Sequence, residues 1–132
     1  MTAAASSAPM LLDLFAAEAK GLLGRIEAGV ASLGHGADGA ALDAILDALH
    51  TLAGAVRAVE LLELECLCHA LERLFGAARA PGAAPLPRET IAAALALAPQ
   101  LIGVPAGRIR NQALALCGQL DALAARPAQP RP

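Results

Sequence analysis

The sequence has no tryptophan, no tyrosine and only two phenylalanines, so the large side chains that often fill a protein core are almost missing. The chain is nevertheless 57% hydrophobic over 132 residues, and its interior must therefore be built from leucine and alanine. Both residues favour helices, whereas strands favour β-branched and aromatic residues. A chain of this length can bury one core. We therefore expect a single all-α domain.

The chain also lacks any long basic run, and its net charge is −2. Nucleic-acid binding depends on clustered lysine and arginine, so we expect no nucleic-acid partner. Charged residues recur in every apolar segment, which predicts no membrane insertion. The cysteines Cys66, Cys68 and Cys117 are an odd number, and no leader-like segment precedes them. This pattern indicates reduced core thiols in a cytoplasmic protein.

Apolar residues recur every three or four positions in five segments, which is the spacing of amphipathic helices. Residues 1–8 are expected to form a flexible N-terminal arm, and Pro9 fits the first turn of the first helix. Asp38 has the chemistry of a cap for the second helix. Pro99 lies inside the fourth pattern and predicts a kink there.

Prolines in residues 80–87 mark the clearest loop, and the other connections between the helical patterns are short. Long helices with short connections favour an antiparallel four-helix bundle with an additional C-terminal fifth helix, which we assign to residues 9–125. Residues 126–132 contain three prolines and are expected to form a tail or an interdomain linker.

His50 follows the inward-facing Leu49, so its ring lies about 100° farther around the helix, at the edge of the apolar stripe. There it can meet solvent or a partner. Gly54 lies four residues later above the same face, although a glycine inside a helix costs roughly 1 kcal/mol relative to alanine. This glycine suggests that something approaches the helix closely beside His50.

A histidine that accepts a phosphoryl group needs one ring nitrogen free as the nucleophile and the other held as an N–H donor. His69 and Glu72 are three residues apart and share one face of the third helix, which an antiparallel hairpin can bring against the second helix. Glu72 is then the candidate that orients His50, and His69 is a candidate hydrogen-bonding neighbour.

The run from His50 to Gly54 resembles the His-x-x-Lys-Gly phosphoacceptor motif of histidine phosphotransfer (HPt) domains. The pair His69-x-x-Glu72 is similar to one in the amino-terminal phosphoacceptor domain of CheA-type chemotaxis histidine kinases. The resemblance covers most of the chain. It implies that His50 accepts a phosphoryl group from the ATP-binding domain of a kinase and passes it to an aspartate on the receiver domain of a response regulator.

The sequence departs from this motif at Ala53, where the family usually has a lysine beside the phosphoryl group. The loss of that lysine bears on the rate or stability of phosphorylation, and Arg57, one turn farther on, is the candidate replacement cation. We expect Ala53, Gly54 and Arg57 to lie where a partner docks. By contrast, Glu60, Glu63 and Glu65 are interpreted as a solvated acidic face.

The resemblance implies no cofactor and no metal for this chain, because the phosphoryl group is carried covalently on His50 and ATP is bound by another domain. No catalytic activity is expected of the chain alone, although it fits a fragment of a histidine protein kinase. Two alternatives remain open: a phosphorylation-inert HPt-like bundle that serves docking or dimerisation, and a helical enzyme that uses His50 and Glu72 as an acid–base pair.

Overall fold

A computed structural model describes residues 3–33 and 38–127. These residues form five α-helices and one short 3-10 helix, with no strand among them, so the all-α prediction is confirmed. The elements in chain order are α1 (Ala3–Ser32), α2 (Gly39–Ala58), α3 (Leu62–Ala77), α4 (Arg88–Leu97), η1 (Ala98–Leu101) and α5 (Gly107–Ala124).

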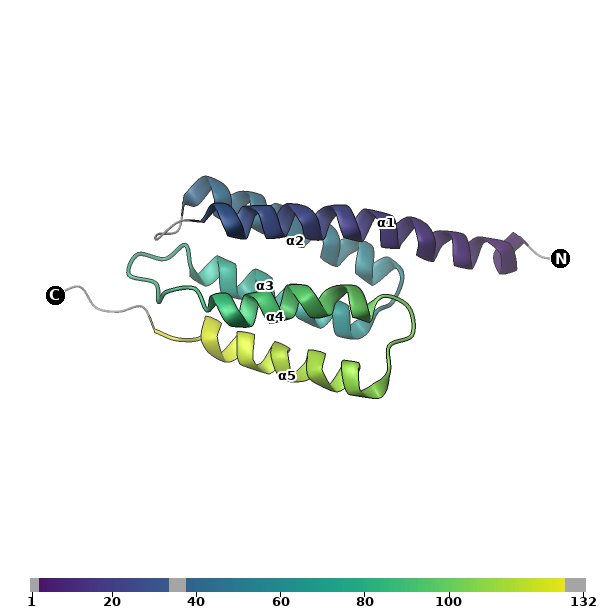
Figure 1. Ribbon diagram of the computed structural model, residues 1–132. Helices are drawn as coiled ribbons and strands as arrows, with labels where there is room; N and C mark the ends of the chain where they lie inside the picture. The colour runs from purple at the N-terminus through teal and green to yellow at the C-terminus, as the bar shows by residue number, and fades with distance from the viewer. Residues whose placement is uncertain (1–2, 34–37, 128–132) are drawn as a thin grey trace.

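Helices α1 to α4 run alternately up and down and form the antiparallel bundle, and α5 packs along α3 and α4 as the additional helix (Figure 1). Leucine, isoleucine and alanine make up most of the core, and the two phenylalanines, Phe15 and Phe75, are both buried in it. The largest fully buried aliphatic side chains come from every α-helix: Ile26, Leu42, Ile45, Leu49, Leu52, Val56, Leu64, Leu67, Ile91 and Leu120.

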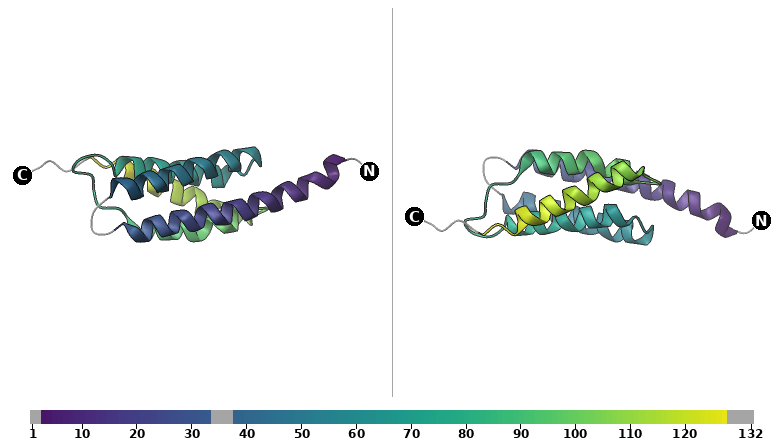
Figure 2. Two further views of the ribbon diagram at one scale, coloured as in Figure 1. Left: turned by 90° about the horizontal axis from the view of Figure 1, so that it is seen from above. Right: turned by 90° about the horizontal axis from the view of Figure 1, so that it is seen from below.

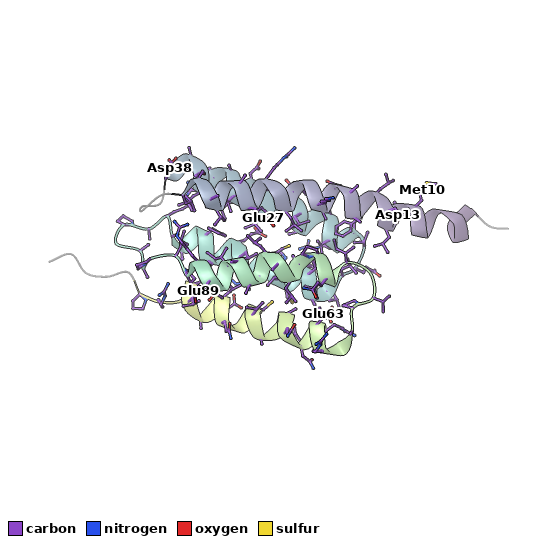
Figure 3. All side chains as sticks on the ribbon, in the orientation of Figure 1. Met10, Asp13, Glu27, Asp38, Glu63 and Glu89 are labelled. Atoms are coloured by element: carbon purple, nitrogen blue, oxygen red, sulfur yellow. The ribbon has the colours of Figure 1, made fainter. Side chains whose placement is uncertain are left out.

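Helix α1 begins at Ala3, six residues before the predicted start at Pro9. The helix therefore continues through Pro9, although an interior proline loses one backbone hydrogen bond and crowds the carbonyl four residues earlier; the alanines on its N-terminal side are the strongest helix formers. The first turns of α1 project beyond the other helices (Figure 2). Met10 and Asp13 lie on this projecting part (Figure 3), and the Met10 side chain is exposed.

Two local predictions concerned the ends of other helices. Asp38 caps α2 as expected, because its side chain accepts a hydrogen bond from the backbone N–H of Ala40. Pro99 does not kink a continuous helix: α4 ends at Leu97, and the chain continues as the 3-10 helix η1 with Pro99 in its first turn. A proline cannot donate the backbone hydrogen bond that the next α-helical turn requires.

Within the described residues, α2 is long and apolar enough to cross a membrane by length and composition alone. This differs from the expectation that no segment would reach that threshold. The helix packs against α1 on one side and α3 on the other. Its apolar residues, including Leu42, Leu49 and Val56, are buried there, as in a core helix of a bundle.

Candidate functional site

A tight turn between α2 and α3 sets the geometry of the site. The N–H of Glu60 donates to the carbonyl of Arg57, and the N–H of Leu61 donates to that of Val56. This is the paired hydrogen-bond pattern of a Schellman motif, which ends a helix through a residue in the left-handed region. Here that residue is Glu60, with a φ of 58°. The chain reverses within three residues, so α3 runs back along α2.

The antiparallel hairpin brings two pairs of side chains together. His50 on α2 faces Glu72 on α3, and Arg57 on α2 faces Glu65 on α3. Arg57 comes seven residues after His50 on α2, and Glu65 comes seven residues before Glu72 on α3. Because the two helices run in opposite directions, both pairs fit the same alignment of α2 against α3. Seven residues are about two helical turns, which keeps both pairs on the same face. The sequence predicted the meeting of His50 and Glu72, and the structure places them next to each other.

The His50 side chain is 84% exposed, while Glu72 behind it is only 24% exposed. The Nδ1 atom of His50 lies 3.8 Å from Oε2 of Glu72, which is within ion-pair range and longer than a hydrogen bond. A carboxylate on that side favours the tautomer that carries its proton on Nδ1. In that tautomer Nε2 keeps its lone pair, as a nucleophile requires.

His69 lies between two carboxylates on its own helix. Its Nδ1 is 3.2 Å from Oε1 of Glu72, and its Nε2 is 3.4 Å from Oε2 of Glu65. The same Oε2 of Glu65 accepts a hydrogen bond of 3.1 Å from Nε of Arg57. His69 was predicted to be a hydrogen-bonding neighbour of the site, and its contact is with Glu72, the residue that faces His50.

Glu63 and Glu65 were interpreted from the sequence as part of a solvated acidic face, and the structure corrects this. The Glu63 side chain is 17% exposed and pairs with Arg110. The Glu65 side chain is 20% exposed and bonds to both Arg57 and His69. The Arg57 guanidinium holds the pKa of Glu65 below its ordinary value, and the hydrogen bond with His69 adds to this effect. The seven-residue spacing of the two cross-helix pairs is the sequence signal that could have identified this residue.

The three residues predicted for docking have different environments. Gly54 is exposed, and a Cβ atom added there would meet nothing within 4 Å. Ala53 is only 4% exposed, so its side chain adds no contact surface, and docking over this small residue stays a prediction. It turns toward the core because it lies one position past the buried Leu52 on the inward stripe of α2. Arg57 is exposed and is paired with Glu65.

The cysteines are all free, and their burial differs. Cys68 and Cys117 are buried, as predicted for core thiols, whereas Cys66 is exposed, which corrects its assignment to the core. Burial raises the pKa of the Cys68 thiol to about 12 and that of Cys117 to about 11, so both stay protonated near neutral pH. No group of three His, Cys, Asp or Glu side chains in the described ranges is placed to hold a metal ion.

Comparisons with known proteins identify the family. The family model described as Hpt domain matches residues 10–126, which is most of the chain. The matched range spans the bundle, α5 and every residue of the site described above. No curated protein and no solved structure gives a match.

Proposed function

The chain belongs to the Hpt domain family, whose members carry phosphoryl groups on a histidine in two-component signalling, and we propose that His50 is the phosphoacceptor of this chain. One observation carries the proposal: His50 is exposed and has a partly buried carboxylate, that of Glu72, facing its Nδ1 atom. A nucleophilic histidine needs one ring nitrogen oriented by such a group and the other open to the phosphoryl donor.

The proposed reaction uses the two ring nitrogens of His50 differently. The Nε2 lone pair attacks the γ-phosphorus of ATP held by a kinase domain, the N–P bond forms, and the bond to the bridging oxygen of ADP breaks. The proton on Nδ1 stays in place. Glu72 then offsets the positive charge that develops on the ring, which is electrostatic stabilisation by a group already in position. Transfer to an aspartate breaks the N–P bond and restores the neutral histidine.

The resemblance of His69 and Glu72 to the CheA-type pair supports a more specific proposal for the partners. We assign the donor to the ATP-binding domain of a chemotaxis-type histidine kinase and the acceptor to the receiver domain of a response regulator, both in the cytoplasm. The exposed Gly54 supports docking beside His50, because a partner can approach the α2 backbone there without meeting a side chain. In this proposal the chain binds no cofactor of its own.

The test is phosphorylation of the purified chain by two donors. One sample receives γ-labelled ATP and the kinase region of a CheA-type protein, and another receives phosphoramidate, a small phosphoryl donor that needs no docking. We expect an acid-labile label that is lost in His50→Gln. The substitution should leave the fold unchanged because the side chain is exposed, and circular dichroism checks this.

The outcomes separate the proposal from its alternative. A label that persists in His50→Gln would place the phosphoacceptor elsewhere. A wild-type chain that takes up no phosphoryl group from either donor would contradict the proposal and favour the phosphorylation-inert docking module.

A further inference from the structure

Both ring nitrogens of His69 face carboxylates, which is unusual for a histidine on a helix surface. Glu72 lies three residues after His69 and Glu65 lies four residues before it, so all three side chains share one face of α3. A neutral imidazole carries one N–H and donates to only one of the two carboxylates at a time, whereas an imidazolium donates to both. The orientation of His69 is therefore set by two neighbours.

Glu65 is in turn anchored from the opposite helix. Nε of Arg57 lies 3.1 Å from Oε2 of Glu65, the same oxygen that faces His69. A hydrogen bond between two ionised groups is stronger than one between neutral groups. The contacts form a continuous path from Arg57 through Glu65, His69 and Glu72 to His50, and the path crosses from α2 to α3 and back.

This path of contacts is relevant to Ala53, which stands where the family usually has a lysine. Ala53 lies three residues after His50, and His69 lies three residues before Glu72, so the hairpin register places Ala53 opposite His69. The short Ala53 side chain is only 4% exposed, so it supplies no charged partner for Glu72. In this chain the group that contacts Oε1 of Glu72 is the His69 ring.

We propose that Glu65 is a positioning residue for the phosphoacceptor: anchored by Arg57, it orients His69, and His69 holds Glu72 against His50. The proposal rests on the proposed function of His50. Glu65 itself touches neither His50 nor the phosphoryl donor. Its effect is on the orientation of Glu72 and hence on which nitrogen of His50 carries the proton.

The experiment compares Glu65→Ala and Glu65→Gln with Glu63→Ala in the full chain. Glu63 is a matched control because it is also a partly buried glutamate of α3 and also binds an arginine of a neighbouring helix, Arg110 of α5, but it bonds to no histidine within the described residues. Two quantities are measured: the rate of labelling of His50 by phosphoramidate, and the nitrogen chemical shifts of His50 and His69, which report the tautomer of each ring without any phosphorylation.

We expect Glu65→Ala to slow labelling about fivefold to tenfold, as for the loss of one hydrogen bond of typical net strength. Glu65→Gln keeps an acceptor oxygen and should lie between Glu65→Ala and wild type. In Glu65→Ala the His50 shifts should move toward a mixture of tautomers, while Glu63→Ala should match wild type in both measurements. Circular dichroism confirms that each variant is folded.

Equal labelling rates and equal histidine shifts in Glu65→Ala and Glu63→Ala would overturn the proposal. This failure is distinct from failure of the proposed function, in which the wild-type chain itself is not labelled at His50. If labelling slows but the His50 shifts do not change, Glu65 acts on something other than the tautomer, and the positioning role is also rejected.

Discussion

Helix α3 packs against α2 on one side and against α5 on the other, and arginine–carboxylate ion pairs cross both interfaces. On the α5 side, Arg73 bonds to both carboxylate oxygens of Asp121, and Arg110 bonds to Glu63. Glu63 lies near the start of α5 (Figure 3). None of the contacts described for these four side chains is with a histidine. Glu63 precedes Arg73 on α3, and their partners Arg110 and Asp121 follow in the same order on α5. The two helices that these pairs join therefore run parallel.

On the α2 side the same kind of pair continues into imidazole rings. Glu65 is shared between Arg57 and His69, and Glu72 is shared between His69 and His50. An exposed ion pair alone contributes little to stability, typically less than about 1 kcal/mol. The difference between the two faces is therefore chemical: one set of carboxylates pairs with arginines, and the other also contacts histidines, which we propose it orients. Substitutions on the α2 side should then change the labelling of His50, whereas substitutions on the α5 side should change stability.

Glu72→Gln should give the largest functional effect. It removes the charge behind Nδ1 of His50. Carboxylates that orient metal-bound histidines typically contribute about tenfold to a hundredfold, and we take that range as the scale for this carboxylate. We expect the rate of His50 labelling by phosphoramidate to fall by about that factor, with little change in the free energy of unfolding measured in urea.

The matched change on the other face is Asp121→Asn, which breaks the pair with Arg73. It should lower stability slightly and leave the labelling rate as in wild type. A labelling rate that falls equally in both variants would mean that the α5 face also serves the site, and the distinction between the faces would not hold.

Ala113→Leu should give the largest effect on stability. Ala113 is fully buried on α5, and forcing a larger side chain into a packed interface typically costs about 1–3 kcal/mol. Ala115→Leu adds the same atoms at an exposed position of the same helix and is the control. Urea unfolding should separate the two variants. As long as the Ala113→Leu variant is folded, its His50 should be labelled at the wild-type rate, because the path of contacts to His50 lies on the opposite face of α3.

Gly54→Ala should raise stability and slow only the transfer between proteins. Neither Gly54 on α2 nor Gly118 on α5 has an atom within 4 Å of an added Cβ, so both substitutions should stabilise their helix by roughly 0.5–1 kcal/mol. Only the Gly54 methyl group lies beside His50. We expect slower labelling from the kinase and unchanged labelling from phosphoramidate. If Gly118→Ala slows labelling by the kinase as much as Gly54→Ala does, docking is not confined to the α2 side.

The sequence was sufficient to predict the helices, the bundle with its additional helix and the residue types of the site. These features depend on the spacing of apolar residues and on separations of three or four positions within one helix, both of which a sequence displays directly. The meeting of His50 and Glu72 followed from a single assumption, an antiparallel hairpin between α2 and α3.

The features that the sequence did not predict depend on the register between helices. Glu65 looked like its exposed neighbour Glu60 because both are acidic residues near the start of α3. Only the register fixed by the turn at Glu60 brings Glu65 to Arg57, eight residues away along the chain. The burial of Ala53 and the exposure of Cys66 depend in the same way on how each helix is rotated against its neighbours. Periodicity leaves that rotation uncertain for residues at the edge of a stripe.

The smallest expected effect is a pH dependence common to the two faces. The hydrogen bond from Arg110 lowers the pKa of Glu63, and that from Arg57 lowers the pKa of Glu65. A group whose pKa is lower in the folded chain than in the unfolded chain stabilises the fold fully above its unfolded value, here 4.5, and loses that contribution as pH falls through its folded value.

Thermal unfolding measured from pH 7 to pH 3 should therefore show a falling midpoint below about pH 4.5. Glu63→Gln and Glu65→Gln should each flatten that fall by a similar small amount, because each removes one such carboxylate. At neutral pH the two variants should differ in one measurement, the nitrogen shifts of His50, because these shifts respond to Glu65 and not to Glu63. Identical acid profiles combined with different histidine shifts would show that similar ion pairs stabilise both faces and that only the pair on the α2 side also orients the phosphoacceptor.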